Sequence, residues 1–534
     1  MHATVTPAGE AGLLIEYGDA ISRDTSRRVL AAARYIRRQG PAGIEDIVPA
    51  YTTVLVLFDR RQLSYGDLKT FVEGHSGAID PAPESPSTRD VRMLPVAYGG
   101  SDGPDLERIA SETGLAPDEV VRIHTETPYR VCFLGFTPGY PYLSGLDPRI
   151  RVPRLRTPRV RVPAGSVAIA GLQTGLYPME SPGGWSVIGR TPVSLFNPLA
   201  AEPTFLLPGD EVQFYRVPGP VAPKPLPQPD FQPHHPLCRV LMPGLYTTIQ
   251  DRGRIGYMHL GVGRAGAADP HSLHRANAML GNAPGAAALE MTALGAQVEF
   301  LADALIALAG AEAQPLVDGR PVDPRHPVAI EAGQHLSFGA FHSGLRAYLA
   351  VAGGFDAPVI MGSRSTDTVA GFGGLLGAPL KPGTVLGRAT SPPPAGDGSV
   401  ACADEPAQGI FRVRTVPGPQ SDHFPERSRR ILEEDTFIVS GDSNRMGLRL
   451  SGERTIPHNQ LGPEVISEGI APGSIQVPGD GNPIVMGSNA QTTGGYAKIG
   501  VVIRNDLARL GQAQPGDRVR FQLISRAEAE TIGR

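Results

Sequence analysis

One histidine stands beside a carboxylate in the C-terminal third of the chain, in the segment Ser421-Asp422-His423-Phe424. An imidazole titrates near neutral pH, so His423 is the best candidate for a general acid or base by residue type. Asp422 would orient the ring if the local backbone allowed it. Adjacent side chains usually point apart, so a surface or capping role for His423 is the competing interpretation.

Two turns share the pattern Gly-Gly-aromatic and precede a cation: Gly183-Gly184-Trp185 before Arg190, and Gly494-Gly495-Tyr496 before Lys498. Consecutive glycines allow backbone N–H groups to point into a concavity, and the cation adds positive charge. This combination suits a carboxylate or a phosphate. The alternative is that the glycines form tight corners of a β-barrel, and the sequence leaves both interpretations open.

Aromatic residues crowd a predicted strand and turn at residues 129–142, YRVCFLGFTPGYPY. Phe136, Tyr140 and Tyr142 would form an apolar wall for a small ring, or they would pack one end of a barrel. The residue types favour neither interpretation over the other.

Polar residues follow a second predicted strand near residue 250. Asp251, Arg252 and Arg254 stand where side chains often line sites, but a salt-bridged turn explains them as well. Asp269 followed by proline predicts the start of a short helix over 271–280, with Gly281 as its stop. The cap gives Asp269 a structural role.

Several motif classes are absent. The sequence has no GxxxxGK[ST] loop, no HExxH, no zinc-type cysteine pairing, and no lysine between methionines as in a biotin acceptor. We therefore expect no bound metal, and carboxybiotin would have to come from another chain. A net charge of −4, a pI near 6.4 and the lack of a secretory leader or long apolar run predict a cytoplasmic protein, with neither nucleic acid nor membrane as partner.

A long pattern occurs twice. Val162–Arg190, VPAGSVAIAGLQTGLYPMESPGGWSVIGR, is matched more loosely by Ala471–Gly500, APGSIQVPGDGNPIVMGSNAQTTGGYAKIG. Each copy is followed by a similar strand, PGDEVQF at 208–214 and PGDRVRF at 515–521. The shared order predicts two copies of one β-rich module.

Around these modules the chain divides at proline-rich tracts. Alternating strand and helix patterns predict a small α+β unit at the N-terminus, and high glycine and proline content with globular hydrophobicity predicts many short strands elsewhere. PAPESPSTRD and SPPPAGDGS are linker-like. The predicted units are 1–85, 91–217, a linker at 218–236, 237–395 and 405–534.

As a set, the motifs resemble a known family. GFTPGYPYLSGLD and the first repeat copy resemble allophanate hydrolase subunit 1, also called KipI or the B subunit of 5-oxoprolinase. TTIQDRGRIGYMHLGVGRAGAADP, GSRSTDTVAGFGG, SNRMGLRLSG and NAQTTGGYAKIGVVIRNDLARLGQ resemble allophanate hydrolase subunit 2, also called KipA or the C subunit of 5-oxoprolinase. The resemblance implies a natural fusion of the two subunits. It also implies a mainly β protein with α+β parts: a ferredoxin-like N-terminal domain followed by three cyclophilin-like barrels.

The related region of urea carboxylase is a carboxyltransferase domain whose site lies in a cleft between two subunit-like halves. By position, the resemblance implies Asp422, His423 and Lys498 as catalytic residues. It implies a substrate-binding set made of Phe136, Tyr140, Tyr142, Arg161, Ser181, Gly183, Gly184, Trp185, Arg190, Gln491, Thr492, Gly494, Gly495 and Tyr496. The sequence departs from the family pattern at Asn489, where aspartate is expected, and at Ala497, where proline is usual.

The resemblance favours one function and leaves two alternatives. The first is a component of ATP-dependent 5-oxoprolinase, which opens 5-oxo-L-proline to L-glutamate with a separate A subunit, using ATP with Mg as co-substrate. The second is biotin-dependent carboxyl transfer to urea or a related amide. The third is a non-enzymatic inhibitor of a sensor histidine kinase. Allophanate hydrolysis is least favoured, since no Ser-Ser-Lys amidase pattern is present.

Overall fold

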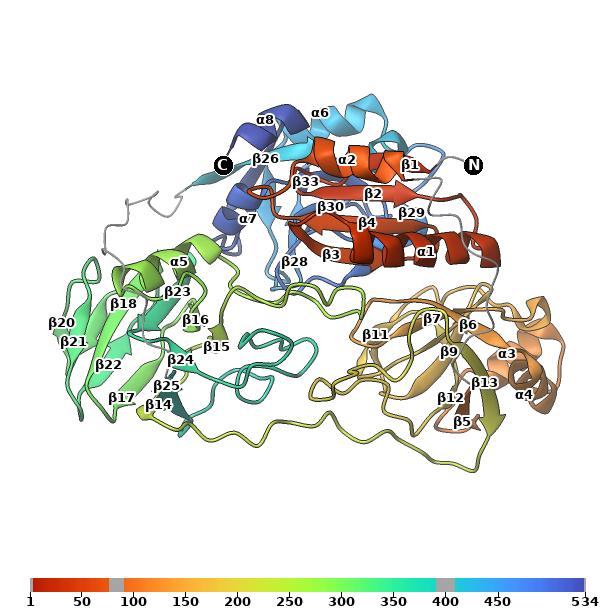
Figure 1. Ribbon diagram of the computed structural model, residues 1–534, viewed down its shortest axis with the longest axis horizontal. Coiled ribbons are helices and arrows are strands. Elements are labelled where there is room, and N and C mark those ends of the chain that lie inside the picture. Colours follow the sequence, from red (N-terminus) through yellow and green to blue (C-terminus); the bar gives the residue numbers. More distant parts are fainter. Residues whose placement is uncertain (1–2, 76–90, 390–408, 533–534) are drawn as a thin grey trace.

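The computed structural model describes residues 3–75, 91–389 and 409–532, which form four units (Figure 1). The two linker-like tracts PAPESPSTRD and SPPPAGDGS lie outside the described residues. In Figure 1 the N-terminal unit and the last unit lie together, and the two middle units sit below them on opposite sides. The fold is mixed α/β and mainly strands. None of the helices in the described ranges is long and apolar enough to cross a membrane.

The N-terminal unit is a four-stranded antiparallel sheet with two helices on one face. Its sheet order is β1-β2-β4-β3, and its elements are β1 (Thr4–Pro7), β2 (Gly12–Glu16), α1 (Arg23–Gln39), β3 (Ile44–Pro49), β4 (Thr53–Phe58) and α2 (Tyr65–Gly74). Ser22 caps α1 by accepting a hydrogen bond from the Thr25 N–H, and Ser64 caps α2 in the same way. The apolar stripe of α1 then packs onto the sheet.

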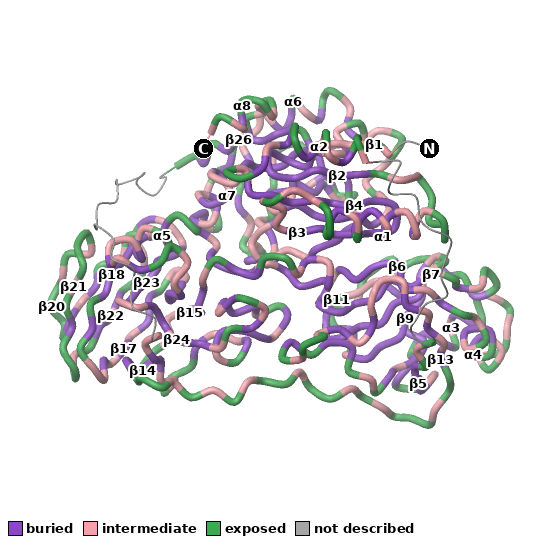
Figure 2. Tube along the Cα trace, in the orientation of Figure 1, coloured by how far each residue is buried: buried purple, intermediate pink, exposed green. Residues whose placement is uncertain are grey.

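The opposite face of this sheet is also buried. Leu14, Leu55 and Leu57 pack against Met258 and Ala471 from the C-terminal half. A sheet that is apolar on both faces needs a cover on each, so the N-terminal unit is held against the rest of the chain. Figure 2 shows β2 and β4, the two central strands, largely buried.

The next unit is a closed seven-stranded barrel in the order β10-β7-β6-β13-β5-β12-β9. Its strands are β5 (Arg92–Tyr98), β6 (Tyr129–Leu134), β7 (Pro141–Ser144), β9 (Ser166–Ala170), β10 (Gln173–Leu176), β12 (Ser186–Arg190) and β13 (Glu211–Arg216). The parallel pair of β5 and β13 closes it. A small sheet of β8 (Arg159–Val162) and β11 (Ser181–Gly183), a 3-10 turn η1 (Pro148–Ile150), and helices α3 (Leu106–Thr113) and α4 (Pro117–Glu126) flank it.

The last unit repeats this barrel strand for strand, in the order β26-β33-β30-β31-β28-β27-β34. Its strands are β26 (Ile410–Pro417), β27 (Phe437–Val439), β28 (Gly447–Ser451), β30 (Ser474–Gln476), β31 (Ile484–Met486), β33 (Lys498–Val502) and β34 (Arg518–Leu523). β26 and β34 again pair in parallel, and β29 (Glu464–Gly469) with β32 (Thr493–Tyr496) again forms a small flanking sheet. η2 (Ser421–His423), α6 (Glu426–Glu434), α7 (Arg504–Leu510) and α8 (Arg526–Thr531) complete the unit. The predicted pair of β-rich modules is confirmed.

The third expected barrel is absent from the described residues, because the strands of the middle unit form two separate sheets. One has the order β20-β19-β22-β17-β14-β25-β24 and the other β15-β16-β23-β18-β21. The strands are β14 (Pro236–Met242), β15 (Tyr246–Gln250), β16 (Ala288–Thr292), β17 (Gln297–Phe300), β18 (Ala304–Glu312), β19 (Pro315–Val317), β20 (Arg320–Pro321), β21 (Val328–Ile330), β22 (His335–Phe338), β23 (Ser343–Val351), β24 (Phe355–Asp356) and β25 (Val385–Arg388). The sheets share one apolar core, and α5 (Pro270–Met279) packs on β18 and β23.

Two long loops of this unit contact the other units. The loop between β15 and α5 runs to the other units: Gly256 and Met258 donate backbone hydrogen bonds to Asp46, and the Leu260 carbonyl accepts one from Gly139. Phe372, from the loop between β24 and β25, packs against the core of the first barrel. These segments fix the units to one another instead of continuing the ladder within the middle unit.

Candidate active site

A buried ion pair occupies one end of the second barrel. Lys498 at the start of β33 pairs in register with Gln476 of β30, and Lys498 Nζ lies 2.6 Å from Glu468 Oε1. Gln420 Nε2 donates to the same carboxylate oxygen at 2.8 Å. All four side chains are buried. We call these residues, Gln420, Glu468, Gln476 and Lys498, the Lys498 cluster.

The second Gly-Gly turn makes room for polar groups beside this cluster. A Cβ on Gly494 would lie 2.9 Å from Gln491 Nε2 and 3.0 Å from Gln476 Nε2, so a larger residue would displace the two amides. Gln476 Nε2 and Thr492 Oγ1 are buried without a hydrogen-bond partner among the described residues. Buried polar atoms normally find a partner, so these groups are available to a ligand.

In the first barrel, the positions equivalent to those of Lys498 and Gln476 hold apolar residues. Val187 takes the position of Lys498 and pairs with Ala168, which takes the position of Gln476. Tyr140 and Trp185 fill the space next to them, with ring centroids 6.2 Å apart. Here the aromatic residues pack a barrel end, as one of the two interpretations predicted.

This aromatic packing extends to the other predicted residues of the first barrel. Tyr142 is stacked on Phe133 with centroids 4.4 Å apart, and desolvation raises the pKa of the buried Tyr140 and Tyr142 hydroxyls. A Cβ on Gly183 would lie 2.3 Å from the Tyr177 hydroxyl oxygen. The first Gly-Gly turn is therefore a close-packed corner.

The ends of the two barrels touch. The Phe136 N–H, at a positive φ of 63°, donates to Thr493 Oγ1 at 3.0 Å. A Cβ on Gly135 would lie 2.1 Å from the same hydroxyl oxygen. Phe136, predicted to line a shared cleft, thus contacts Thr493, which lies between the predicted residues Thr492 and Gly494.

The remaining predicted residues are not members of the Lys498 cluster. Arg161 is exposed and pairs with Glu180 at 2.7 Å, and Arg190 Nε donates to the Ala164 carbonyl at 2.7 Å. Ser181 Oγ is buried and has no hydrogen-bond partner within the described ranges, Gly184 lies beside Pro158, and Gly495 and Tyr496 continue the small sheet of β29 and β32.

The expected pairing of Asp422 with His423 does not form. His423 Nδ1 lies 2.9 Å from the Gly462 carbonyl oxygen, while Asp422 is exposed. The two residues are neighbours on η2, where adjacent side chains diverge. A carbonyl oxygen can only accept, so Nδ1 is the donor in this contact, and in the neutral ring Nε2 would be the acceptor.

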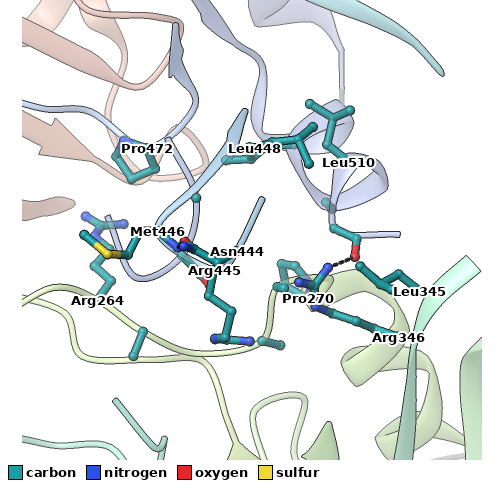
Figure 3. Close-up of a pocket in the computed structure, with 18 of the residues that line it drawn as sticks. Arg264, Pro270, Leu345, Arg346, Asn444, Arg445, Met446, Leu448, Pro472 and Leu510 are labelled. Carbon is teal, nitrogen blue, oxygen red and sulfur yellow. Dashed lines mark hydrogen bonds between the residues drawn. The ribbon is translucent and has the colours of Figure 1, made fainter. Parts of the chain in front are cut away.

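A pocket lies elsewhere, at the junction of the N-terminal unit, the middle unit and the second barrel (Figure 3). Its volume is about 830 Å³. Six arginines line it against a single acidic lining residue, Glu45; they are Arg61, Arg252, Arg264, Arg346, Arg445 and Arg504. We call it the arginine pocket. None of the residues predicted as catalytic or substrate-binding lines it.

A buried Arg–Glu–Arg arrangement forms one wall of the arginine pocket. Glu290 accepts hydrogen bonds from Tyr348 Oη at 2.7 Å, from the Ala268 N–H at 2.9 Å and from Arg445, and Arg346 Nε lies 3.6 Å away. Burial by itself raises the pKa of Glu290, but Arg445 and Arg346 offset this, and the pKa ends below its ordinary value. Glu290 is therefore ionised between two guanidinium groups.

One sequence signal pointed to this wall. Glu290 and Arg346 are charged residues inside otherwise apolar strands, β16 and β23, and such residues require a buried partner. Arg445 stands in SNRMGLRLSG, a motif quoted above only for the resemblance.

The polar residues after β15 stabilise loops. Asp251 accepts hydrogen bonds from the Ser363 and Ser365 hydroxyls, and Arg254 is buried with its guanidinium 4.6 Å from the centre of the Phe372 ring. Asp269 caps α5 through the His271 and Ser272 N–H groups, as predicted. The described residues hold no group of three His, Cys, Asp or Glu side chains that could bind a metal ion.

The chain is similar in sequence to proteins of one known family. Models of the carboxyltransferase domain match residues 3–207 (subdomains C and D) and 260–523 (subdomains A and B). The C subunit of 5-oxoprolinase from Escherichia coli (strain K12) is 38% identical over 299 residues, 55% of this chain and 93% of that protein. The B subunit of 5-oxoprolinase from Bacillus subtilis (strain 168) is 41% identical over 219 residues, 39% of this chain and 90% of that protein.

The chain belongs to the carboxyltransferase-domain family. Its two halves are homologous to the B and C subunits of 5-oxoprolinase, joined in one polypeptide. The crystal structure of TTHA0988 has the same overall fold, with a TM-score of 0.85 and 37% identity over 97% of this chain and 100% of that one.

The carboxyltransferase-domain protein departs from the expected family motif at Asn489, and the structure shows what the asparagine does. Asn489 Oδ1 accepts from Arg445 Nε at 2.9 Å, and Asn489 Nδ2 donates to Asp367 Oδ1 at 3.0 Å. An amide can accept on one side and donate on the other, whereas a carboxylate can only accept. Asn489 thereby links the arginine pocket wall to the buried carboxylate of Asp367.

Proposed function

We propose that this protein is a component of ATP-dependent 5-oxoprolinase, which converts 5-oxo-L-proline to L-glutamate together with a separate A subunit. One observation carries the proposal: each half of the chain matches a 5-oxoprolinase subunit over at least 90% of that subunit's length. The proposal includes a cytoplasmic location, a ferredoxin-like N-terminal unit and cyclophilin-like barrels. It also includes the unit boundaries predicted from sequence.

The contacts between the halves support a joint role for them. Arg264, from the half that is homologous to the C subunit, binds Asp46 at 2.7 Å and Glu45 at 3.0 Å in the N-terminal unit. Arg504 binds Glu45 at 3.0 Å as well. These pairs are mostly buried, and breaking a buried pair costs about 3–5 kcal/mol, so the two halves are expected to act as one body.

The proposed chemistry starts from the low reactivity of a lactam. ATP would transfer its γ-phosphoryl group to the lactam oxygen and leave as ADP. Water would then attack the activated carbon, and loss of phosphate with cleavage of the ring C–N bond would give glutamate. Gln476 Nε2 and Thr492 Oγ1, which have no hydrogen-bond partner among the described residues, would donate to the charge that develops on oxygen, beside the Lys498–Glu468 ion pair. His423 Nε2 is the acceptor available for the proton of the attacking water.

The arginine pocket fits ATP poorly. A triphosphate carries several negative charges, but five of the six arginines of the arginine pocket already contact protein acceptors. We therefore assign ATP with Mg to the A subunit or to its interface with this chain.

The test is release of glutamate and phosphate from 5-oxo-L-proline and ATP, with this protein and an A subunit assayed alone and mixed. Equal release in the mixture only is the expected result. Oxygen-18 in the lactam carbonyl should appear in phosphate, and its absence there would refute the phosphorylated intermediate. No turnover with an A subunit that is active with its own partners would refute the proposal.

The family description favours a second candidate, carboxyl transfer to urea or a related amide. Carboxybiotin on another chain would then be the co-substrate. Decarboxylation of carboxybiotin that depends on urea and on this protein would establish it.

A further inference from the structure

One surface of the molecule is strongly basic, although the whole chain carries a net charge of −4. It begins on α1, which has six arginines and a single acidic residue, Asp24, among its 17 residues. Figure 1 shows α1 on the side of the N-terminal unit that is nearest the first barrel. Four of its arginines follow the 3.6-residue period of the helix and form one stripe: Arg23, Arg27, Arg34 and Arg38.

The stripe costs α1 stability, because like charges four residues apart on a helix repel. Arg34 and Arg38 have this spacing, are exposed, and have no hydrogen-bond or ion-pair partner in the part of the chain that the structure describes. The surface of α4 is built differently, since Arg122 pairs with both Glu119 and Glu126 at 2.6 Å. The uncompensated arginines of α1 therefore indicate a role other than helix stability.

The stripe continues into a groove between the N-terminal unit and the first barrel, with a volume of about 780 Å³. Arg23, Arg130 and Arg151 line the groove. Glu211 is the one acidic residue of its described lining, and it lies 3.5 Å from Arg23. Arg151 is exposed and has no ion-pair partner within the described ranges.

The groove and the stripe form one region of positive potential. Desolvation, Arg130 and Arg38 each lower the pKa of Arg34, so charges from the first barrel and from α1 meet at this side chain. A cluster of like charges attracts ligands of the opposite sign. We call this region the basic face and define it by Arg23, Arg34, Arg38, Arg130 and Arg151.

Aliphatic side chains are exposed at the same groove. Ile21 is 39% exposed, and Leu172, on the turn between β9 and β10, is 47% exposed. Arginine beside exposed apolar side chains is typical of surfaces that bind other proteins.

The length of the basic face favours a polymeric ligand over a small anion. Arg38 follows Arg23 by fifteen residues, which is about 22 Å along the helix axis. An extended polypeptide covers this distance with about seven residues, whereas a single carboxylate or phosphate reaches only one end of it.

We propose that the basic face docks an extended acidic segment of a partner protein, with carboxylates at Arg34, Arg38 and Arg151 and apolar side chains against Ile21 and Leu172. The inference does not depend on the proposed reaction. None of the residues of the basic face belongs to the Lys498 cluster or lines the arginine pocket. Its test needs no turnover.

The test measures binding of a fluorescein-labelled peptide, in which glutamate alternates with leucine, to the full chain by fluorescence anisotropy. The reference peptide has glutamine in place of every glutamate. The acidic peptide should bind and the reference peptide should not, and the affinity should fall as salt is added. Arg34→Glu combined with Arg151→Glu should weaken binding by roughly tenfold or more, because attraction becomes repulsion at two points.

A further variant should bind more tightly, which a misfolded protein would not do. Glu211→Gln removes the carboxylate that competes for Arg23 and should raise the affinity about two- to fivefold, the range expected for a surface ion pair. The matched control is Arg320→Glu combined with Arg325→Glu. Both of these arginines are exposed on the middle unit, and the control changes the net charge by the same amount as the double variant of the basic face.

Three results would overturn the proposal. Equal binding of the two peptides would show that charge is not recognised. An equal loss of affinity in the control pair, or an unchanged affinity in Glu211→Gln, would show that net charge acts instead of the basic face. Tighter binding of a single-stranded oligonucleotide of the same charge, in competition with the peptide, would assign the basic face to nucleic acid.

Discussion

Replacing Asn489 by aspartate tests the account of the pocket wall. The variant restores the residue expected from the family motif, yet it places a carboxylate where Asn489 Nδ2 now donates to Asp367 Oδ1 at 3.0 Å. Two charges about 4 Å apart repel by about 4 kcal/mol at an effective dielectric constant near 20. Arg445, which contacts Asn489 Oδ1 at 2.9 Å, offsets a similar amount.

The net cost is therefore the lost hydrogen bond from Asn489 Nδ2 to the charged Asp367, which is worth about 1.5–3 kcal/mol. We therefore expect the variant to be about 2 kcal/mol less stable at neutral pH, with an unfolding temperature that is lower by several degrees. A shared proton between the two carboxyls would relieve the repulsion. The folded-state pKa of the pair is thus raised, so the deficit should be full at pH 7.5 and shrink as the pH falls toward 5.

The assay is thermal unfolding of wild type and variant in parallel at several pH values. Asn197→Asp is the control, since Asn197 is exposed and its side chain accepts a hydrogen bond from the Leu199 N–H, which aspartate can also do. An Asn489→Asp protein as stable as wild type at pH 7.5 would refute the reasoning. A deficit that does not change with pH would refute the part that rests on charge repulsion.

Three further predictions follow from the packing. Lys498→Met or Glu468→Leu alone should lower the free energy of unfolding by about 3–5 kcal/mol, because each leaves one buried charge unpaired. The double variant should recover most of that stability while remaining inactive in the reconstituted assay. An equal loss of stability in the double variant would contradict this prediction. Desolvation lowers the pKa of His124 to about 3, so the folded protein, which buries the neutral ring, loses stability as the pH falls from 6.5 toward 3. His124→Phe should make the free energy of unfolding depend less on pH in acid unfolding curves. An unchanged pH dependence would count against this prediction. Gly135→Ala should lower the free energy of unfolding by about 1–3 kcal/mol, because the added methyl group would clash with Thr493 of the second barrel. Thr493→Ala should restore part of that stability. An unchanged unfolding temperature in Gly135→Ala would show that the barrels separate easily.

The sequence alone determined the features that depend on local patterns. The two repeat copies, the Asp269 helix cap and the motifs of the family are all encoded within short stretches. Turn and cap preferences act over a few residues, and hydrophobic alternation follows the period of the strand, so such features can be predicted from composition and order. Sequence likewise predicted the aromatic crowding at 129–142, but not whether it forms a wall or a packed end.

Only the tertiary structure decided which copy of the repeat carries polar chemistry. Val187 and Lys498 occupy the same place in the two barrels, and the difference matters because Glu468 and Gln420 converge on one of them. The resemblance implied a third barrel, whereas the strands of the middle unit form two separate sheets.

The arginine pocket shows the physical reason most clearly. Its walls bring together Glu45, Arg252, Arg346 and Arg445, which lie far apart in the sequence and meet only because both faces of the N-terminal sheet must be covered. Which carboxylate Arg346 and Arg445 pair with depends on how the units pack across those interfaces. Local sequence patterns specify the elements, whereas the pairing of buried charges is fixed by the packing of the elements against one another.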